Sequence, residues 1–152
     1  MLTRGRPRQQ FFTMKLLLVK GDKHVGKSTT CRWVYLKLKS SGATTEFMDL
    51  INGFGDIETV LTWNGSKIAI YTAGDEKQNL INARRLADKW ECDVLIAAVT
   101  KGLHRNETLS DLEDRKDIFW FQLEKGSDET EIDKNEELLT KEIISKTEEI
   151  IN

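Results

Sequence analysis

The chain has 152 residues, of which 39% are hydrophobic and 32% are charged, and its formal net charge is −2 at neutral pH. This length and composition predict one soluble domain with a hydrophobic core of its own. The near-neutral charge gives no electrostatic reason to expect nucleic acid as a partner, and no apolar run approaches the roughly 18 residues that a membrane-spanning helix needs.

Residues 1–13 differ in composition from the rest of the chain. They contain Arg4, Arg6 and Arg8 together with the only proline, and they contain no acid. We therefore expect a disordered basic extension, followed by a single folded domain over residues 14–152. An alternative start at Met14, a vector remnant, or a basic arm that touches nucleic acid are the other interpretations of this segment.

A complete phosphate-binding pattern follows the extension. Residues 16–19 are apolar and predict a short buried strand, and residues 21–28 have the sequence G-D-K-H-V-G-K-S, which matches G-x-x-x-x-G-K-[ST]. Residues 28–39 lack Gly and Pro and predict a helix. Because a strand enters this loop and a helix leaves it, successive backbone N–H groups can converge on phosphate oxygens. The competing interpretation is an ordinary glycine-containing turn with a solvated lysine.

The pattern gives roles to individual residues. Lys27 is expected to reach the β- and γ-phosphate oxygens, and the Ser28 hydroxyl is expected to bind Mg²⁺. Thr29 is a candidate donor to the α-phosphate, and Gly26 lets the backbone approach the phosphate where a β-carbon would collide. The full set expected to contact nucleotide is Gly21, Lys23, His24, Val25, Gly26, Lys27, Ser28, Thr29 and, far along the chain, Gly74.

The middle and end of the chain alternate strands with helices. Two runs of strand-forming residues, 57–63 and 67–73, flank Asn64-Gly65, and this pair predicts a β-hairpin because both turn residues accept positive φ. The strand-helix-strand alternation that follows predicts a parallel sheet. The other expected elements are strands at 44–48, 93–99 and 118–123, helices at 77–90 and 128–152, and a helical turn or short helix at 107–115.

Two aspartates are candidates to hold Mg²⁺ or its water shell. Asp75 follows the apolar strand that ends near Tyr71, and Asp49 ends the strand predicted at 44–48. Asp75 is the first choice, and Asp49 would either bind the metal through water or take a proton from an acceptor hydroxyl. Either aspartate also fits the simpler role of a helix cap or turn residue.

Several other charged or reactive side chains lie outside the phosphate-binding pattern. Lys101 and Arg105, after the strand at 93–99, are candidates to approach the phosphates, whereas His104 is expected to be a solvated loop residue. The two cysteines fit neither a disulfide framework nor a metal-binding spacing, so we expect a reducing cytoplasm and an inert Cys31. The acidic C-terminal segment is expected to be a helix packed on the sheet, with a partner-binding tail as the alternative.

Two segments resemble Ras-like small GTPases. Residues 17–28 resemble the first motif of that family, and Thr72-Ala-Gly-Asp-Glu76 resembles its Asp-Thr-Ala-Gly-Gln-Glu switch motif. The chain departs from the family at Tyr71, which replaces the switch aspartate, and at Asp75, which replaces the water-orienting glutamine. An Asn-Lys-x-Asp motif is also missing. The resemblance therefore implies nucleotide binding without guanine specificity, and ATP is expected rather than GTP.

The loop followed by Ser-Thr-Thr also resembles small P-loop kinases, which implies an acceptor-site role for Asp49 and a lid role for residues 100–105. A kinase lid carries several arginines, whereas this segment has only Arg105. More broadly, the chain is similar to small nucleotide-binding proteins of the P-loop NTPase superfamily.

These observations predict an α/β, three-layer fold with a mostly parallel sheet of about five or six strands and an antiparallel hairpin at one edge. The expected function is Mg²⁺-dependent binding of ATP, with ATPase or kinase-like phosphoryl transfer in which Lys27 and Asp75 are catalytic. The alternative is a nucleotide-dependent switch that regulates a protein partner with little turnover. A purely structural protein with a degenerate loop is the third hypothesis.

Overall fold

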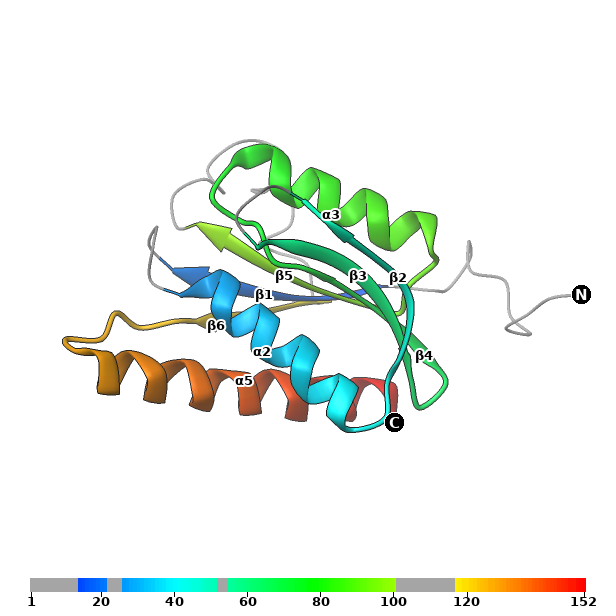
Figure 1. Ribbon diagram of the computed structural model, residues 1–152. Helices are drawn as coiled ribbons and strands as arrows, with labels where there is room; N and C mark the ends of the chain where they lie inside the picture. The colour runs from blue at the N-terminus through cyan, green and yellow to red at the C-terminus, as the bar shows by residue number, and fades with distance from the viewer. Residues whose placement is uncertain (1–13, 22–25, 52–54, 101–116) are drawn as a thin grey trace, which may run out of the picture.

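Six strands form a single sheet in the order β2-β3-β4-β5-β1-β6, with helices on both of its faces (Figure 1). The computed structural model describes residues 14–21, 26–51, 55–100 and 117–152. The expected extension at 1–13 and the helical segment at 107–115 lie outside these residues. The elements are β1 (Lys15–Gly21), α2 (Lys27–Ser40), β2 (Thr44–Leu50), β3 (Ile57–Trp63), β4 (Ser66–Tyr71), α3 (Lys77–Lys89), β5 (Val94–Thr100), β6 (Ile118–Gln122) and α5 (Glu129–Ile151).

The sheet is mostly parallel, as expected. Strand β1 pairs in parallel with β5 on one side and with β6 on the other, and β4 also pairs in parallel with β5. All seven residues of β5 are buried, because a parallel strand in the middle of a sheet is covered on both faces by helices. The apolar runs of β1 and β5 are therefore the centre of the fold.

The antiparallel edge is wider than predicted. The hairpin of β3 and β4 turns at Asn64 and Gly65, whose φ angles of 50° and 82° fit the expected turn. However, β2 pairs antiparallel with β3 outside the hairpin and is itself the edge strand. It also extends to Leu50, so that Asp49 lies within the strand and does not follow it.

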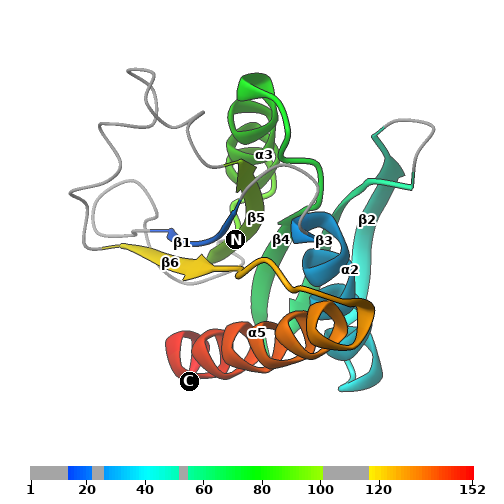
Figure 2. The ribbon, with the colours of Figure 1, turned by 90° about the vertical axis from the view of Figure 1, so that its left-hand side faces the viewer.

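Two hydrophobic cores lie on opposite faces of the sheet. Helix α3 covers one face, and α2 and α5 lie side by side on the other (Figures 1 and 2). One side of α3 is buried in the first core through Leu80, Ala83, Leu86 and Ala87. Leu139 and Ile143 of α5 are buried in the second core, together with Val34 and Leu38 of α2. The C-terminal helix therefore packs on the sheet, as expected.

The connections between the parallel strands leave β1 and β5 in opposite directions. The chain leaves β1 through α2 toward the β2–β4 side of the sheet, whereas it leaves β5 toward β6 on the far side of β1. In open α/β sheets, ligands bind outside the carboxyl ends of the strands at such a switch point. In Figure 2 the carboxyl ends of β1 and β5 face the viewer. Within the described residues, no helix has the length and apolar character that a membrane span requires.

Candidate functional site

The backbone conformation at the start of α2 requires glycine. Gly26, the residue before the helix, has a φ of 100°, which L side chains rarely adopt. A β-carbon at Gly26 would also collide with the Glu136 carboxylate of α5. The helix has no side-chain cap at this end and no acid in its first turn. Its first N–H groups and the positive end of its dipole therefore suit an anion.

Lys27 and Asp75 lie together at the carboxyl edge of the sheet. The Lys27 side chain is only 4% exposed, and its Nζ lies 3.6 Å from Oδ1 of Asp75, which is about half exposed. Asp75 follows β4 and contacts Thr100 at the end of β5, so Lys27 meets this carboxylate at the carboxyl ends of these strands. A buried ammonium group needs nearby negative charge, and Asp75 supplies part of it.

Thr100 holds the Asp75 segment in place. Its hydroxyl lies 2.8 Å from the Gly74 carbonyl oxygen and 2.9 Å from Oδ1 of Asp75, and its N–H donates to the same Gly74 carbonyl at 3.0 Å. A β-carbon at Gly74 would collide with the Ala98 carbonyl. Gly74 is therefore required for the close approach of this segment to β5, in addition to the phosphate contact that the sequence predicted for it.

A second network joins α2 to the hairpin strands. The Ser28 hydroxyl donates to the Thr72 carbonyl oxygen at 2.7 Å, and the Thr72 hydroxyl donates to Oδ1 of Asp56 at 2.9 Å. Arg32 lies 3.6 Å from the same Asp56 oxygen and donates to the Thr29 hydroxyl at 3.2 Å. Ser28, the expected metal ligand, is thereby connected to the beginning of β3.

Thr100, Asp56 and Arg32 were missed as site residues. Thr100 is the first polar residue after the all-apolar run of β5, and this position at a strand end was the signal that could have found it. Asp56 comes directly before the strand run at 57–63 and was treated as part of a loop. Only the fold brings Asp56 to α2, because Asp56 lies 24 positions after Arg32 in the sequence.

Asp49 lies elsewhere. It is exposed on β2, four strands away from β1 in the sheet order, and its Oδ1 accepts a hydrogen bond from the Leu50 N–H at 2.9 Å. Its register partner is Glu58. Burial, and secondarily the Asp49 charge, raise the pKa of the Glu58 carboxyl, against the opposing charge of Lys89. The structure thus groups Asp49 with an acid of β3 and does not group it with Lys27 and Asp75.

The structure places two further residues from the sequence analysis, Gly21 and Tyr71. Gly21 ends β1 opposite Thr100 of β5, at the carboxyl edge. Tyr71 stands where the Ras-like small GTPases have an aspartate. Its side chain is buried, and this burial raises the pKa of its phenol. Tyr71 therefore offers no negatively charged ligand like a carboxylate. The remaining candidates lie outside the described residues: Lys23, His24, Val25, Lys101, His104 and Arg105.

Cys31 is buried, which is consistent with the unreactive thiol that the sequence predicts. Its side chain is fully buried in α2. Burial raises the pKa of the thiol from 9.0 to about 12, against the lowering influence of Arg32 and Lys27. The thiol therefore remains protonated at neutral pH and is a packing residue of the second core.

A metal ion at this site would be held by few protein ligands. Within the described part of the chain, no group of three or more His, Cys, Asp or Glu side chains is arranged to bind a metal. Ser28 and Asp75 supply a hydroxyl and a carboxylate oxygen, which are the hard ligands that Mg²⁺ prefers. Such a donor set fits Mg²⁺ that arrives with phosphate oxygens and water, because Mg²⁺ is rarely enclosed by protein ligands alone.

Comparison with protein-family models, with curated proteins and with solved structures finds no match to this chain. A function is therefore inferred from the positions and chemistry of the residues described above.

The pKa of the Glu136 carboxyl predicts how the stability of the fold changes with pH. Burial raises the pKa of its carboxyl, as does neighbouring Asp133, while Arg32 lowers it. The folded state thus binds this proton more tightly than the unfolded state, and stability from the protonated group is lost as the pH rises through the raised pKa. Glu136→Gln should raise the melting temperature at neutral pH. The gain should vanish below the ordinary carboxyl pKa of 4.5, where Glu136 is protonated in both states.

The melting temperatures of Glu136→Gln and of the wild type, monitored by circular dichroism at neutral pH and at about pH 4, measure this gain. Glu142→Gln, on the exposed side of the same helix, is the matched control and should change neither melting temperature appreciably. A Glu136→Gln effect of equal size at both pH values would show that the carboxylate charge is not its cause.

Proposed function

We propose that the chain has a P-loop NTPase fold and binds a Mg²⁺-nucleoside triphosphate at the carboxyl edge of the sheet, where it catalyses ATP hydrolysis or kinase-like phosphoryl transfer. The main support is that Lys27 and Ser28, which the sequence pattern specifies, meet Asp75 and Thr72 at the end of β4. This junction lies at the switch point between β1 and β5.

The charges of these residues suit a triphosphate. The Lys27 ammonium group and the first N–H groups of α2 would bind phosphate oxygens, and Lys27 would remain in place as charge develops on the γ-phosphoryl group. Ser28 and Asp75 would hold Mg²⁺, which would neutralise phosphate charge as a Lewis acid. Thr100 would position Asp75 through its hydrogen bond. ATP is favoured over GTP because the sequence lacks an Asn-Lys-x-Asp motif.

Calorimetric titration with non-hydrolysable ATP and GTP analogues, with and without Mg²⁺, tests nucleotide binding. We expect Mg²⁺-dependent binding that is selective for the ATP analogue. Lys27→Ala should weaken it by about tenfold to a hundredfold, because a hydrogen bond to a charged group contributes ~1.5–3 kcal/mol. The same variant should lose ATP turnover, measured as phosphate release.

Lys39→Ala, in the last turn of the same helix, is the control and should bind like the wild type. Unchanged binding and turnover in Lys27→Ala, with its fold verified by circular dichroism, would reject the proposal. Selective binding of the GTP analogue would instead overturn the preference for ATP.

A nucleotide-dependent switch is the second candidate, and the Ser28–Thr72 hydrogen bond favours it. If the Ser28 hydroxyl turned toward Mg²⁺, it would release the Thr72 carbonyl, and Thr72 also binds Asp56. Occupancy of the site would thus be transmitted to the ends of β3 and β4.

Hydrogen exchange measured with bound diphosphate and with a bound triphosphate analogue tests this mechanism. A switch should exchange at different rates in the two states over residues 51–56 and 72–78, while β5 should be unaffected because it is buried throughout. Identical exchange in both segments would remove the switch hypothesis.

A further inference from the structure

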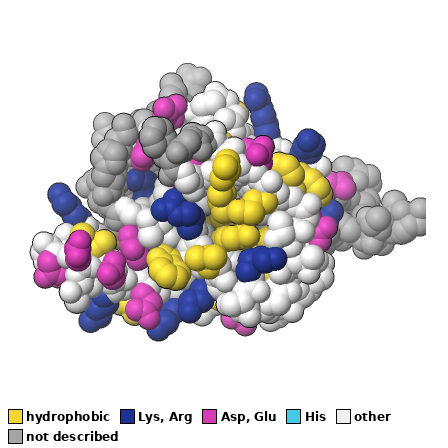
Figure 3. Space-filling view, viewed as in Figure 1, with side chains coloured by type: hydrophobic (Ala, Val, Ile, Leu, Met, Phe, Trp, Pro, Cys, Tyr) yellow, Lys and Arg dark blue, Asp and Glu magenta, His cyan; other side chains and the backbone are white. Residues whose placement is uncertain are grey.

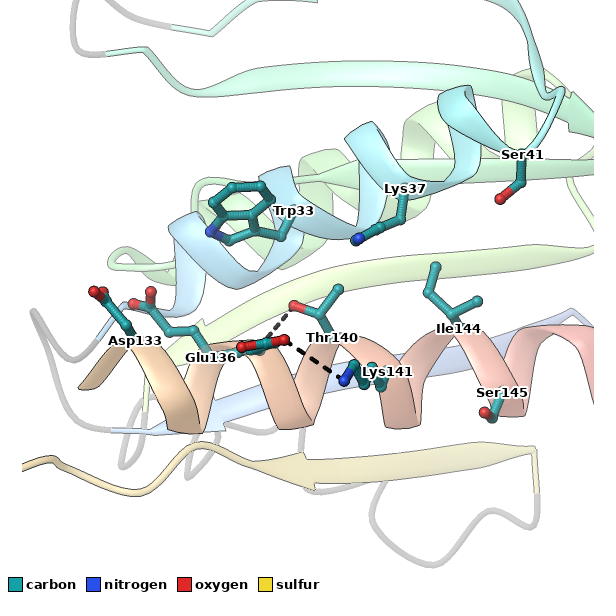
Figure 4. A pocket seen from close by; sticks show the side chains of 10 residues that line it. Trp33, Lys37, Ser41, Asp133, Glu136, Thr140, Lys141, Ile144 and Ser145 are labelled. Carbon is teal, nitrogen blue, oxygen red and sulfur yellow. Dashed lines mark hydrogen bonds and ion pairs between the residues drawn. The ribbon is translucent and has the colours of Figure 1, made fainter. Parts of the chain in front are cut away.

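A groove of about 750 Å³ runs between α2 and α5, on the face of the sheet that these helices cover. Figure 4 shows Trp33 and Lys37 on its α2 side and Asp133, Glu136 and Thr140 on its α5 side. We call it the α2–α5 groove. The proposed function does not use it, although Glu136 at one end lies against Gly26.

One end of the groove is acidic and incompletely neutralised. The Asp133 and Glu136 carboxylates point toward α2 at the same end (Figure 4). Glu136 is only 7% exposed, and its carboxylate has no hydrogen bond or ion pair among the described residues. Burial removes part of the hydration of this carboxylate, and no hydrogen bond or ion pair with a described residue replaces it. This end of the groove is therefore suited to a cation.

The basic residues nearby leave this acidic end available. Lys141 pairs with Glu137 at 3.5 Å, and Lys37 lies farther along the groove, beyond Trp33 (Figure 4). Arg32 acts on Glu136 through its charge, but its guanidinium group contacts Asp56 and Thr29. An incoming cation would thus meet two carboxylates with no basic side chain placed between them in the described structure.

Trp33 adds an aromatic surface opposite the acids. Its side chain is 47% exposed, and an indole ring is the best aromatic partner of a guanidinium or ammonium group. Trp33 also belongs to a set of exposed hydrophobic residues on α2 and β2, which comprises Trp33, Leu36, Met48 and Leu50. Figure 3 shows hydrophobic side chains gathered in a band over these two elements. We call this set the hydrophobic band.

We propose that the α2–α5 groove binds an arginine or lysine side chain of a partner protein, with its cation between Glu136, Asp133 and Trp33. The partner's neighbouring apolar residues would cover the hydrophobic band. Charge complementarity explains the cation, and the continuity of Trp33 with the band favours a protein segment over a free small amine. Arginine is the better fit because its planar guanidinium group can bind a carboxylate and stack on indole together. This binding does not require nucleotide, so its test is independent of the proposed function.

NMR titration of the full chain with short peptides tests the proposal. The probes are acetyl-Leu-Arg-Leu-Leu-amide, the same peptide with neutral citrulline in place of arginine, and N-acetyl-arginine amide. We expect the arginine peptide to bind at least tenfold more tightly than the citrulline peptide. We also expect it to bind at least tenfold more tightly than N-acetyl-arginine amide, because the latter lacks leucines for the band.

Two variants and a control locate the binding. Glu136→Gln should abolish the preference for arginine over citrulline, and Met48→Ser should reduce the advantage of the peptide over N-acetyl-arginine amide. Glu142→Gln, on α5 but outside the groove lining, should change neither ratio. Circular dichroism of each variant excludes unfolding as the cause of a loss.

Four results would overturn the proposal. Equal binding of the arginine and citrulline peptides, or an arginine preference that persists in Glu136→Gln, would reject the cation site. N-acetyl-arginine amide binding as tightly as the peptide would replace the protein partner with a free small cation. Absence of binding by all three probes at millimolar concentration would reject the groove as a binding site.

Discussion

The complete burial of β5 between β4 and β1 determines how the sheet and its two cores are arranged. A strand covered on both faces fixes the two cores, with α3 on one side and α2 and α5 on the other. It also fixes the carboxyl edge, because β1, β4 and β5 run parallel and their carboxyl ends lie on the same side of the sheet. Thr100, at the end of β5, then holds the Gly74–Asp75 segment in reach of Lys27.

The pair of Lys27 and Asp75 connects this architecture to the proposed chemistry. At about 4 Å, opposite unit charges near a protein surface attract by roughly 4 kcal/mol, compared with ~1 kcal/mol in bulk water. Solvent reduces this value at the half-exposed Asp75, while Lys27 is almost fully buried. In our account, phosphate oxygens would replace Asp75 as the partner of Lys27, and Asp75 would turn to Mg²⁺. Glu136, on the other side of Gly26, adds negative charge that a cation in the α2–α5 groove would offset.

The sequence predicted most of the fold because its patterns were local and strong. The Asn64-Gly65 turn, the apolar run of β5 and the helix α3 were correctly placed. The position of β2 outside the hairpin was missed, since strand order depends on contacts between distant segments. Lys27 and Ser28 are specified by a contiguous pattern, whereas Asp56, Thr100 and Glu136 approach α2 only through the fold. The roles of Lys23, His24 and Val25 stay predictions, because these residues lie outside the described structure.

Calorimetric titration of Asp75→Asn with the non-hydrolysable ATP analogue, with and without Mg²⁺, separates the two roles that we propose for Asp75. Without Mg²⁺, the variant should bind more tightly than the wild type, because Asp75 no longer competes for Lys27 or repels phosphate. With Mg²⁺, it should bind more weakly, because a metal ligand is lost. Asp88→Asn, exposed on α3, should match the wild type in both conditions. A change of the same sign with and without Mg²⁺, or no change, would contradict the account.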